Sequence, residues 1–168
     1  VNGAAGAIPN TATKMLNIAH NNSLRLIHLV NDLLDMEKLA AGKMHFELKA
    51  QSLVPIVAQS IEANAAYAAQ YNVKLVLENN VREDVRVTVD AQRLQQVLAN
   101  FLSNAAKFSP PNSNIILRVE DIYNTIRVSV IDLGPGIPDE FRARIFQKFS
   151  QADSSDTRQK GGTGLGLA

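Results

Sequence analysis

The order in which helix and strand patterns follow one another limits the possible folds of this chain more than any other feature. Residues from about 11 to 41 repeat apolar side chains at three- and four-residue spacing, which predicts one long helix that stops at Gly42. Alternating apolar and polar side chains then predict strands, interleaved with two more helical patterns. The strands are expected at 43–49, 73–79, 85–90, 115–121 and 125–132, and the helices at 53–70 and 91–107.

This order of elements favours an α+β fold over a doubly wound parallel sheet. We expect a two-layer α/β sandwich, with helices on one face of a mixed, mostly antiparallel sheet, preceded by the long helix. The residues 122–124 join the last two strands as a hairpin. The long helix has no antiparallel mate within the chain, which predicts a partner helix in a hairpin or in an intermolecular bundle.

Local signals predict where the helices begin and which faces they bury. Thr11 or Thr13 is expected to cap the first helix, Ser52 the second and Asp90 the third. The core face of the third helix is expected to consist of Leu94, Val97, Leu98, Phe101, Leu102 and Ala105.

Composition excludes several classes of function. The 168 residues carry a net charge of +1 without a basic block, so no nucleic-acid partner is expected. The absence of cysteine rules out disulfides and thiolate chemistry and fits a reducing, cytoplasmic compartment. No apolar run approaches the length of a membrane span, so we expect no membrane contact by this segment, although a longer protein containing it could be anchored.

Six of the nine glycines fall in two clusters after the last predicted strand, 132–138 (DLGPGIP) and 160–168 (KGGTGLGLA). Neither the P-loop string nor the dinucleotide-binding fingerprint occurs. Closely spaced glycines expose consecutive backbone N–H groups, and Leu165 and Leu167 indicate a helix beginning there, whose N-terminus favours an anion such as phosphate. A flexible linker is the alternative, but regular leucines are not typical of linkers. Asp132, at a strand end, is suited to accept a hydrogen bond from an amino group such as that of adenine.

The third predicted helix carries a polar stripe. Asn100, Asn104, Lys107 and Phe108 stand at i, i+4, i+7 and i+8 and so share one face. A solvated face is the plainer interpretation of the two asparagines alone. The other interpretation is a site for magnesium and phosphate, because Mg²⁺ prefers oxygen ligands and often takes few of them from the protein.

Taken together, four segments in order resemble the N, G1, F and G2 boxes of sensor histidine kinases. These segments are NFLSNAAKFS (100–109), DLGPGIP (132–138), IFQKFSQAD (145–153) and GGTGLGLA (161–168). In addition, 26–44 (LIHLVNDLLDMEKLAAGKM) resembles the second helix of the dimerisation hairpin of these kinases. The resemblance implies a Bergerat-type ATP-binding fold, with residues 1–42 as part of the hairpin and 43–168 as an ATP-binding catalytic domain, incomplete at its C-terminus.

The resemblance also implies roles for individual residues, with ATP and Mg²⁺ as cofactors. Asn104 would ligate Mg²⁺, Asn100 would support it and Lys107 would neutralise phosphate charge. Asp132 would receive the adenine amino group, beside a wall shaped by Gly134, Gly136 and Phe108. The remaining implied ATP contacts, mostly to phosphate, are Arg158, Gly162, Thr163, Gly164, Leu165 and Gly166.

By the same resemblance, the parent protein would move the γ-phosphoryl group of ATP to an upstream histidine and then to a response regulator receiver domain, as a homodimer through the hairpin. No histidine followed by an acid occurs here, and we do not assign the acceptor role to His20 or His28. The alternative is a regulatory module that binds nucleotide or dimerises without phosphoryl transfer.

Overall fold

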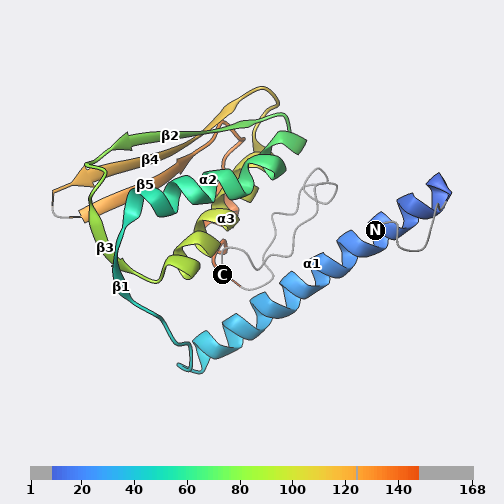
Figure 1. Ribbon diagram of the computed structural model, residues 1–168, viewed down its shortest axis with the longest axis horizontal. Coiled ribbons are helices and arrows are strands. Elements are labelled where there is room, and N and C mark those ends of the chain that lie inside the picture. The colour runs from blue at the N-terminus through green and yellow to red at the C-terminus, as the bar shows by residue number, and fades with distance from the viewer. Residues whose placement is uncertain (1–8, 124, 148–168) are drawn as a thin grey trace.

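The computed structural model describes residues 9–123 and 125–147. Helix α1 (Asn10–Ala40) runs beside an α/β part formed by the rest of these residues (Figure 1). Its end is set by Gly42, with a φ of 64°, whose N–H donates to Leu39 O at 3.0 Å while the Lys43 N–H donates to Lys38 O at 2.8 Å. This pair of bonds is a Schellman motif, so the predicted stop at Gly42 is confirmed.

The predicted start of α1 was wrong. The helix begins at Asn10 after Pro9, and no side chain caps it. The Thr13 hydroxyl instead donates to Pro9 O, at 3.3 Å from within the first turn. The fixed φ of proline suits the position before a helix, but its side chain has no acceptor for the N–H groups of the first turn.

The strands form two sheets. The larger contains β2 (Lys74–Asn80), β4 (Asn114–Ile122) and β5 (Thr125–Ile131), in the order β2-β4-β5. Strand β4 pairs in parallel with β2 and antiparallel with β5. The smaller pairs β1 (Lys49–Ser52) antiparallel with β3 (Arg86–Val89). The expected α+β class with a mixed sheet is confirmed, and β4 and β5 form the predicted hairpin.

The strand predicted at 43–49 was placed too early. Residues 43–48 have no regular structure, and Phe46 and Leu48 are 48% and 62% exposed. Alternation of apolar residues predicts a strand only where one face is covered, and no layer of the described residues covers these side chains. The backbone is held instead by the Glu47 N–H, which donates to Asp90 Oδ2 at 3.0 Å.

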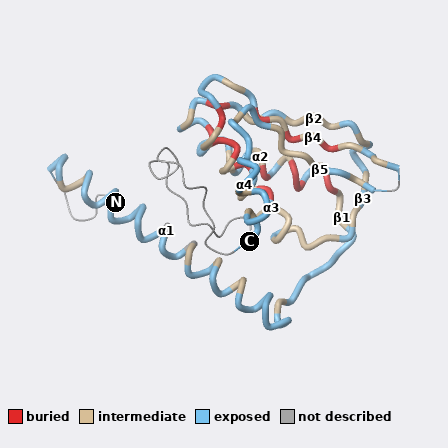
Figure 2. The backbone as a smooth tube through the Cα atoms, turned by 180° about the vertical axis from the view of Figure 1, so that it is seen from behind, coloured by how far each residue is buried: buried red, intermediate tan, exposed pale blue. Residues whose placement is uncertain are grey.

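Helices α2 (Leu53–Gln70) and α3 (Ala91–Phe108) cover one face of the larger sheet (Figure 1). The core lies between these layers, as the buried segments in Figure 2 show. On β4, Ile115, Leu117 and Val119 are fully buried at alternate positions, and from the helices Val57 and Leu102 meet them in one cluster. The buried positions of β4 thus follow the alternating pattern of a strand with one covered face.

Asp90 caps α3 as predicted. Its Oδ1 accepts from the N–H groups of Gln92 at 3.1 Å and Arg93 at 3.2 Å. The Glu47 and Arg93 N–H groups bonded to this carboxylate lower its pKa. Ser52 occupies the expected position before α2, but its side chain makes no capping bond.

Candidate functional site

The polar stripe lies on the side of α3 that does not face the core. Asn100, Asn104, Lys107 and Phe108 are all half-buried, whereas Leu98, Leu102, Ala105 and Ala106 on the other side are buried. Two members of the predicted core face were wrong, because Val97 and Phe101 are 48% and 43% exposed. Both lie at the border between the buried arc and the stripe, where helical spacing alone does not separate core from surface.

The end of the stripe is ordered by contacts between neighbours. The Lys107 Nζ stands 4.9 Å from the centre of the Phe108 ring, a cation–π arrangement. Lys107 and Phe108 make further interactions within the chain. The Ser103 hydroxyl donates to Asn100 O at 3.0 Å. A cationic group and an aromatic ring thus stand together at the C-terminal end of α3.

The loop after β5 meets this end of α3. The Gly134 N–H donates to Asp132 Oδ1 at 2.7 Å, which folds the loop back on itself. A Cβ at Gly134 would lie 2.8 Å from that same oxygen and 3.2 Å from the Phe108 carbonyl oxygen, so the Asp132 side chain would have to move and the backbone contact would be tight. A larger residue here would therefore displace the Asp132 carboxylate, and the close approach shows that the 132–136 loop lies beside the C-terminal end of α3.

Asp132 retains hydrogen-bonding capacity. Among the described residues its one hydrogen bond is to Gly134, through Oδ1, and its side chain is exposed. The second carboxylate oxygen can therefore accept a hydrogen bond from a ligand. Gly136, two residues further, has a φ of 77°, a left-handed conformation that favours glycine, and has open space around it.

The structure thus places the 132–136 loop beside the 107–108 end of α3, the helix that also carries Asn100 and Asn104. Sequence reasoning assigned Phe108 a role through its ring, and did not anticipate that its carbonyl would meet Gly134. The predicted phosphate-binding residues Arg158, Gly162, Thr163, Gly164, Leu165 and Gly166 lie outside the described residues.

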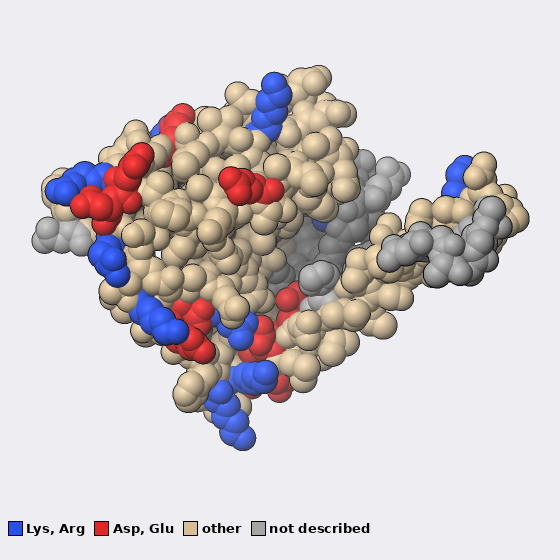
Figure 3. All heavy atoms as spheres, in the orientation of Figure 1, with Lys and Arg blue, Asp and Glu red and all other residues tan. Residues whose placement is uncertain are grey.

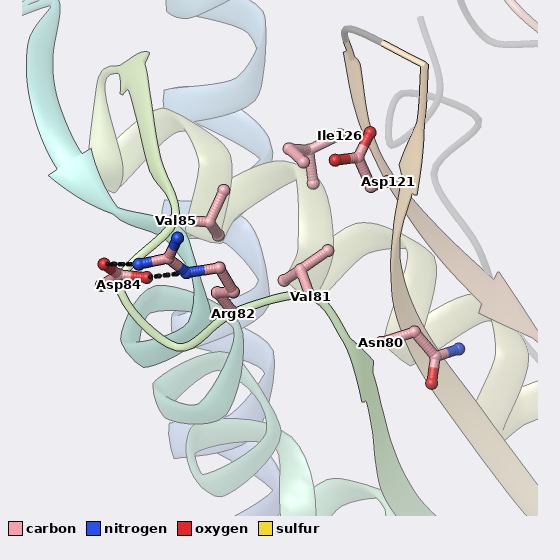
Figure 4. Close-up of a pocket in the computed structure, with 7 residues that line it drawn as sticks. All are labelled: Asn80, Val81, Arg82, Asp84, Val85, Asp121 and Ile126. Atoms are coloured by element: carbon pink, nitrogen blue, oxygen red, sulfur yellow. Dashed lines mark hydrogen bonds and ion pairs between the residues drawn. The ribbon is translucent and has the colours of Figure 1, made fainter.

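A hollow of about 440 Å³ lies elsewhere on the described surface. Its walls come from the connection between β2 and β3 and from the β4–β5 hairpin (Figure 4). Arg82 is already paired there with Asp84 at 2.8 Å. No residue predicted to bind a ligand lines this hollow, so it is distinct from the candidate site.

Helix α1 presents an apolar arc that no described residue covers. Met15, Leu26, Val30, Leu33 and Leu34 fall on one side of the helix and are between 43% and 66% exposed. Figure 3 shows few charged side chains along this helix, while acidic and basic ones gather where it meets the α/β part. Among the helices of the described residues, none has the length and hydropathy needed to cross a membrane.

Comparison with known proteins shows the class of protein to which this chain belongs. Residues 89–168 match the family described as histidine kinase-, DNA gyrase B- and HSP90-like ATPase. The chain is 36% identical over 166 residues to the circadian input-output histidine kinase CikA of Synechococcus elongatus, covering 98% of this chain and 22% of CikA. It is 38% identical over 159 residues to the histidine-protein kinase BarA of Escherichia coli, covering 90% of this chain and 17% of BarA.

Two solved structures agree with these relatives. The catalytic domain of histidine kinase ThkA is 31% identical, with a TM-score of 0.60, and the match covers 74% of this chain and 76% of that domain. Full-length ShkA, solved in complex with AMPPNP, has a TM-score of 0.77 at 27% identity, over 97% of this chain and 33% of ShkA. The chain belongs to the histidine kinase family and matches its catalytic ATP-binding region. It spans 22% or less of the length of CikA and BarA.

Proposed function

We propose that this chain binds Mg²⁺-ATP between the C-terminal half of α3 and the 132–136 loop, and that the protein containing it is a histidine kinase. The observation that supports the proposal is the close approach of Gly134 to the Phe108 carbonyl, which sets the loop with the exposed Asp132 carboxylate beside the C-terminal end of the stripe. The loop then supplies a carboxylate that can accept a hydrogen bond from an amino group. The adjoining helix supplies amide oxygens that can coordinate a metal ion bound to phosphate.

Each residue has a role in this proposal. Asp132 accepts a hydrogen bond from the adenine amino group, and Gly134 and Gly136 leave room for the flat ring beside the backbone. Phe108 flanks the base, and Lys107 neutralises phosphate charge. Among the residues outside the described ranges, the backbone N–H groups around Gly162, Thr163, Gly164, Leu165 and Gly166 and the side chain of Arg158 contact the phosphates.

The residues fit a magnesium ion that is held mainly by the nucleotide. No group of three or more His, Cys, Asp or Glu side chains stands close enough to form a metal site within the described ranges. Asn104 supplies a carbonyl oxygen from the half-buried stripe, and Asn100 supports it one turn earlier. Mg²⁺ takes few protein ligands when phosphates and water supply the others. When bound, the ion would neutralise charge on the transferring phosphoryl group.

The proposed reaction breaks the bond between the γ-phosphorus and its bridging oxygen, which leaves ADP, and forms a bond from phosphorus to a histidine nitrogen outside this chain. An aspartate of a response regulator receiver domain then takes the phosphoryl group. Histidine kinase ThkA has been solved in complex with the response regulator TrrA, at 29% identity to this chain. Because ATP is made inside the cell, we assign the reaction to the cytoplasm.

We further propose that residues 1–42 form part of a dimerisation hairpin and that 43–168 form the catalytic domain. The exposed apolar arc of α1 is the support, because a helix with such an arc needs partner helices to cover it. A homodimer supplies these partners from identical copies.

Replacing Asn104 with alanine tests the metal site. We expect the gain in ATP affinity on adding Mg²⁺ to fall by about 10- to 100-fold, because a metal ligand is removed. Isothermal titration calorimetry with and without Mg²⁺ measures this gain. Asn64→Ala is the matched control, since Asn64 is a half-buried asparagine of α2 whose side-chain amide donates to Ser60 O at 2.7 Å. An undiminished Mg²⁺ effect in Asn104→Ala would contradict the assignment.

The transfer step is tested on the full-length protein with ATP labelled at the γ-phosphate. A kinase incorporates label as phosphohistidine, which is stable in base and labile in acid. A module that only binds nucleotide incorporates none, and this outcome would reject the kinase while leaving the binding site intact.

A further inference from the structure

An ion pair between Asp35 and Arg93 joins α1 to the α/β part. The Arg93 guanidinium of α3 donates from Nη1 to Asp35 Oδ2 at 2.5 Å and from Nη2 to Asp35 Oδ1 at 3.4 Å. Gln96 holds the same guanidinium, accepting from Nη1 at 2.9 Å. With side chains 23% and 33% exposed, Asp35 and Arg93 form the most buried of the six ion pairs among the described residues.

The electrostatics of this pair favour its charged form. Hydrogen bonding to Arg93 lowers the pKa of Asp35 below its usual value. Two parallel N–H···O contacts fix the relative orientation of both side chains as well as their distance. The pair is therefore a directional contact between two helices, unlike the exposed Arg82–Asp84 pair, which lies within one loop.

A second contact fixes the same end of α3. Asp90, the cap of α3, accepts from the Glu47 N–H through Oδ2 while its Oδ1 holds Arg93 N–H. Glu47 belongs to the connection that leaves α1. The Arg93 side chain, in the first turn of α3, thus bonds to α1. The Asp90 cap of the same turn bonds to the connection that follows α1.

The other end of α3 carries the proposed nucleotide site. Arg93 precedes Asn100, Asn104 and Lys107 by 7, 11 and 14 residues, which places all four on one stripe of the helix. Eleven residues of helix span about 16 Å. The N-terminal half of α1 stands clear of the described α/β part in both views, and its side chains there are almost all exposed. The Asp35–Arg93 pair therefore links α1 and α3 near one end of each helix.

We propose that Asp35 and Arg93 are a positioning pair, a latch that fixes the angle between α1 and α3. Given the proposed function, the latch determines where bound ATP stands relative to the helical hairpin. A single ion pair with partly exposed side chains contributes little net free energy and can open. Its opening lets the nucleotide site swing about residues 41–46, the part of the connection that precedes the Glu47–Asp90 bond. The latch touches neither nucleotide nor metal, so its loss leaves nucleotide affinity unchanged.

Distance measurement between spin labels tests the latch. The chain has no cysteine, so Asn22→Cys on α1 and Ala63→Cys on α2, both exposed, give two specific labels. The labelled full chain is diluted with unlabelled chain so that pulsed electron spin resonance reports distances within one copy. We expect one narrow distance distribution in the chain that carries only the two labels. Asp35→Arg and Arg93→Asp are each expected to broaden this distribution, because each substitution leaves two like charges facing each other.

The double substitution D35R/R93D is expected to restore the narrow distribution, since it re-forms the pair with its charges exchanged. If each substitution acted only by disturbing its own helix, the second substitution would not restore the distance distribution. Exchange of Arg82 and Asp84, an ion pair of the same kind inside one loop, should leave the distribution narrow. Unaltered narrow distributions in both single variants, or a double variant as broad as the singles, would overturn the latch.

ATP calorimetry on the same variants separates this inference from the proposed function. Retained affinity with altered distances is the expected result. Absent ATP binding in the unsubstituted chain would reject the proposed function while leaving the distance result to decide the latch. If circular dichroism shows that a charge reversal unfolds the chain, Asp35→Asn removes the ion pair more gently and is expected to broaden the distribution in the same direction.

Discussion

Asp132→Asn is expected to weaken ATP binding by roughly 30- to 100-fold, which corresponds to about 2 to 3 kcal/mol. The amide oxygen of asparagine can still accept from Gly134 N–H, so the loop keeps its shape. The amide NH₂ then occupies the place of Oδ2 and presents a donor to the adenine amino group, where the carboxylate presents an acceptor. Isothermal titration calorimetry in the presence of Mg²⁺ measures the loss.

Asp139→Asn is the matched control for this prediction. Asp139 lies in the first turn of the short helix α4 (Asp139–Arg142), 88% exposed and paired with Arg142 at 3.2 Å. The substitution makes the same chemical change seven residues further on. We expect its ATP affinity to equal that of the unsubstituted chain. Equal losses in both variants would show a general charge effect and would refute the role of Asp132.

Leu102→Ala is expected to lower the free energy of unfolding by about 3 kcal/mol. Leu102 is 1% exposed within the cluster formed by α2, α3 and β4, so its truncation leaves a cavity between the two layers. A change of this size is a large part of the 5 to 15 kcal/mol typical of a domain. Urea unfolding followed by circular dichroism measures the shift, with an unchanged slope expected.

The neighbouring Phe101→Ala is the control for the core prediction. Its side chain is larger but 43% exposed, and we expect a loss of less than about 1 kcal/mol. Should the two substitutions cost the same, the assignment of the buried face of α3 would be wrong.

The sequence predicted the fold well where local pattern and tertiary burial agree. On β4, alternation coincides with the face that the helices cover, and Asp90 and Gly42 act through backbone chemistry that depends on few neighbours. It failed where the outcome depends on distant partners. Phe46 and Leu48 stand at alternate positions, but the described residues leave both side chains exposed, and this segment is irregular.

The sequence suggested the residue types of the candidate site, whose nucleotide-binding role stays a prediction, and only part of the geometry of that site. The stripe on α3 follows from helical spacing, and the loop after β5 follows from its glycines. The contact of Gly134 with a backbone carbonyl has no signature in side-chain chemistry, so no pattern could indicate it. The Asp35–Arg93 pair joins residues 58 positions apart, and charged residues at that separation have many alternative partners.

The central claim is that α3 and the 132–136 loop form one nucleotide site, and nitrogen-15 NMR during titration with Mg²⁺-ADP tests it most directly. The account predicts that the backbone amide of Gly134 and the side-chain amide of Asn104 shift together, with one saturation curve. Shifts confined to the hollow around Asn80 and Asp84, with Gly134 and Asn104 unmoved at saturation, would contradict it.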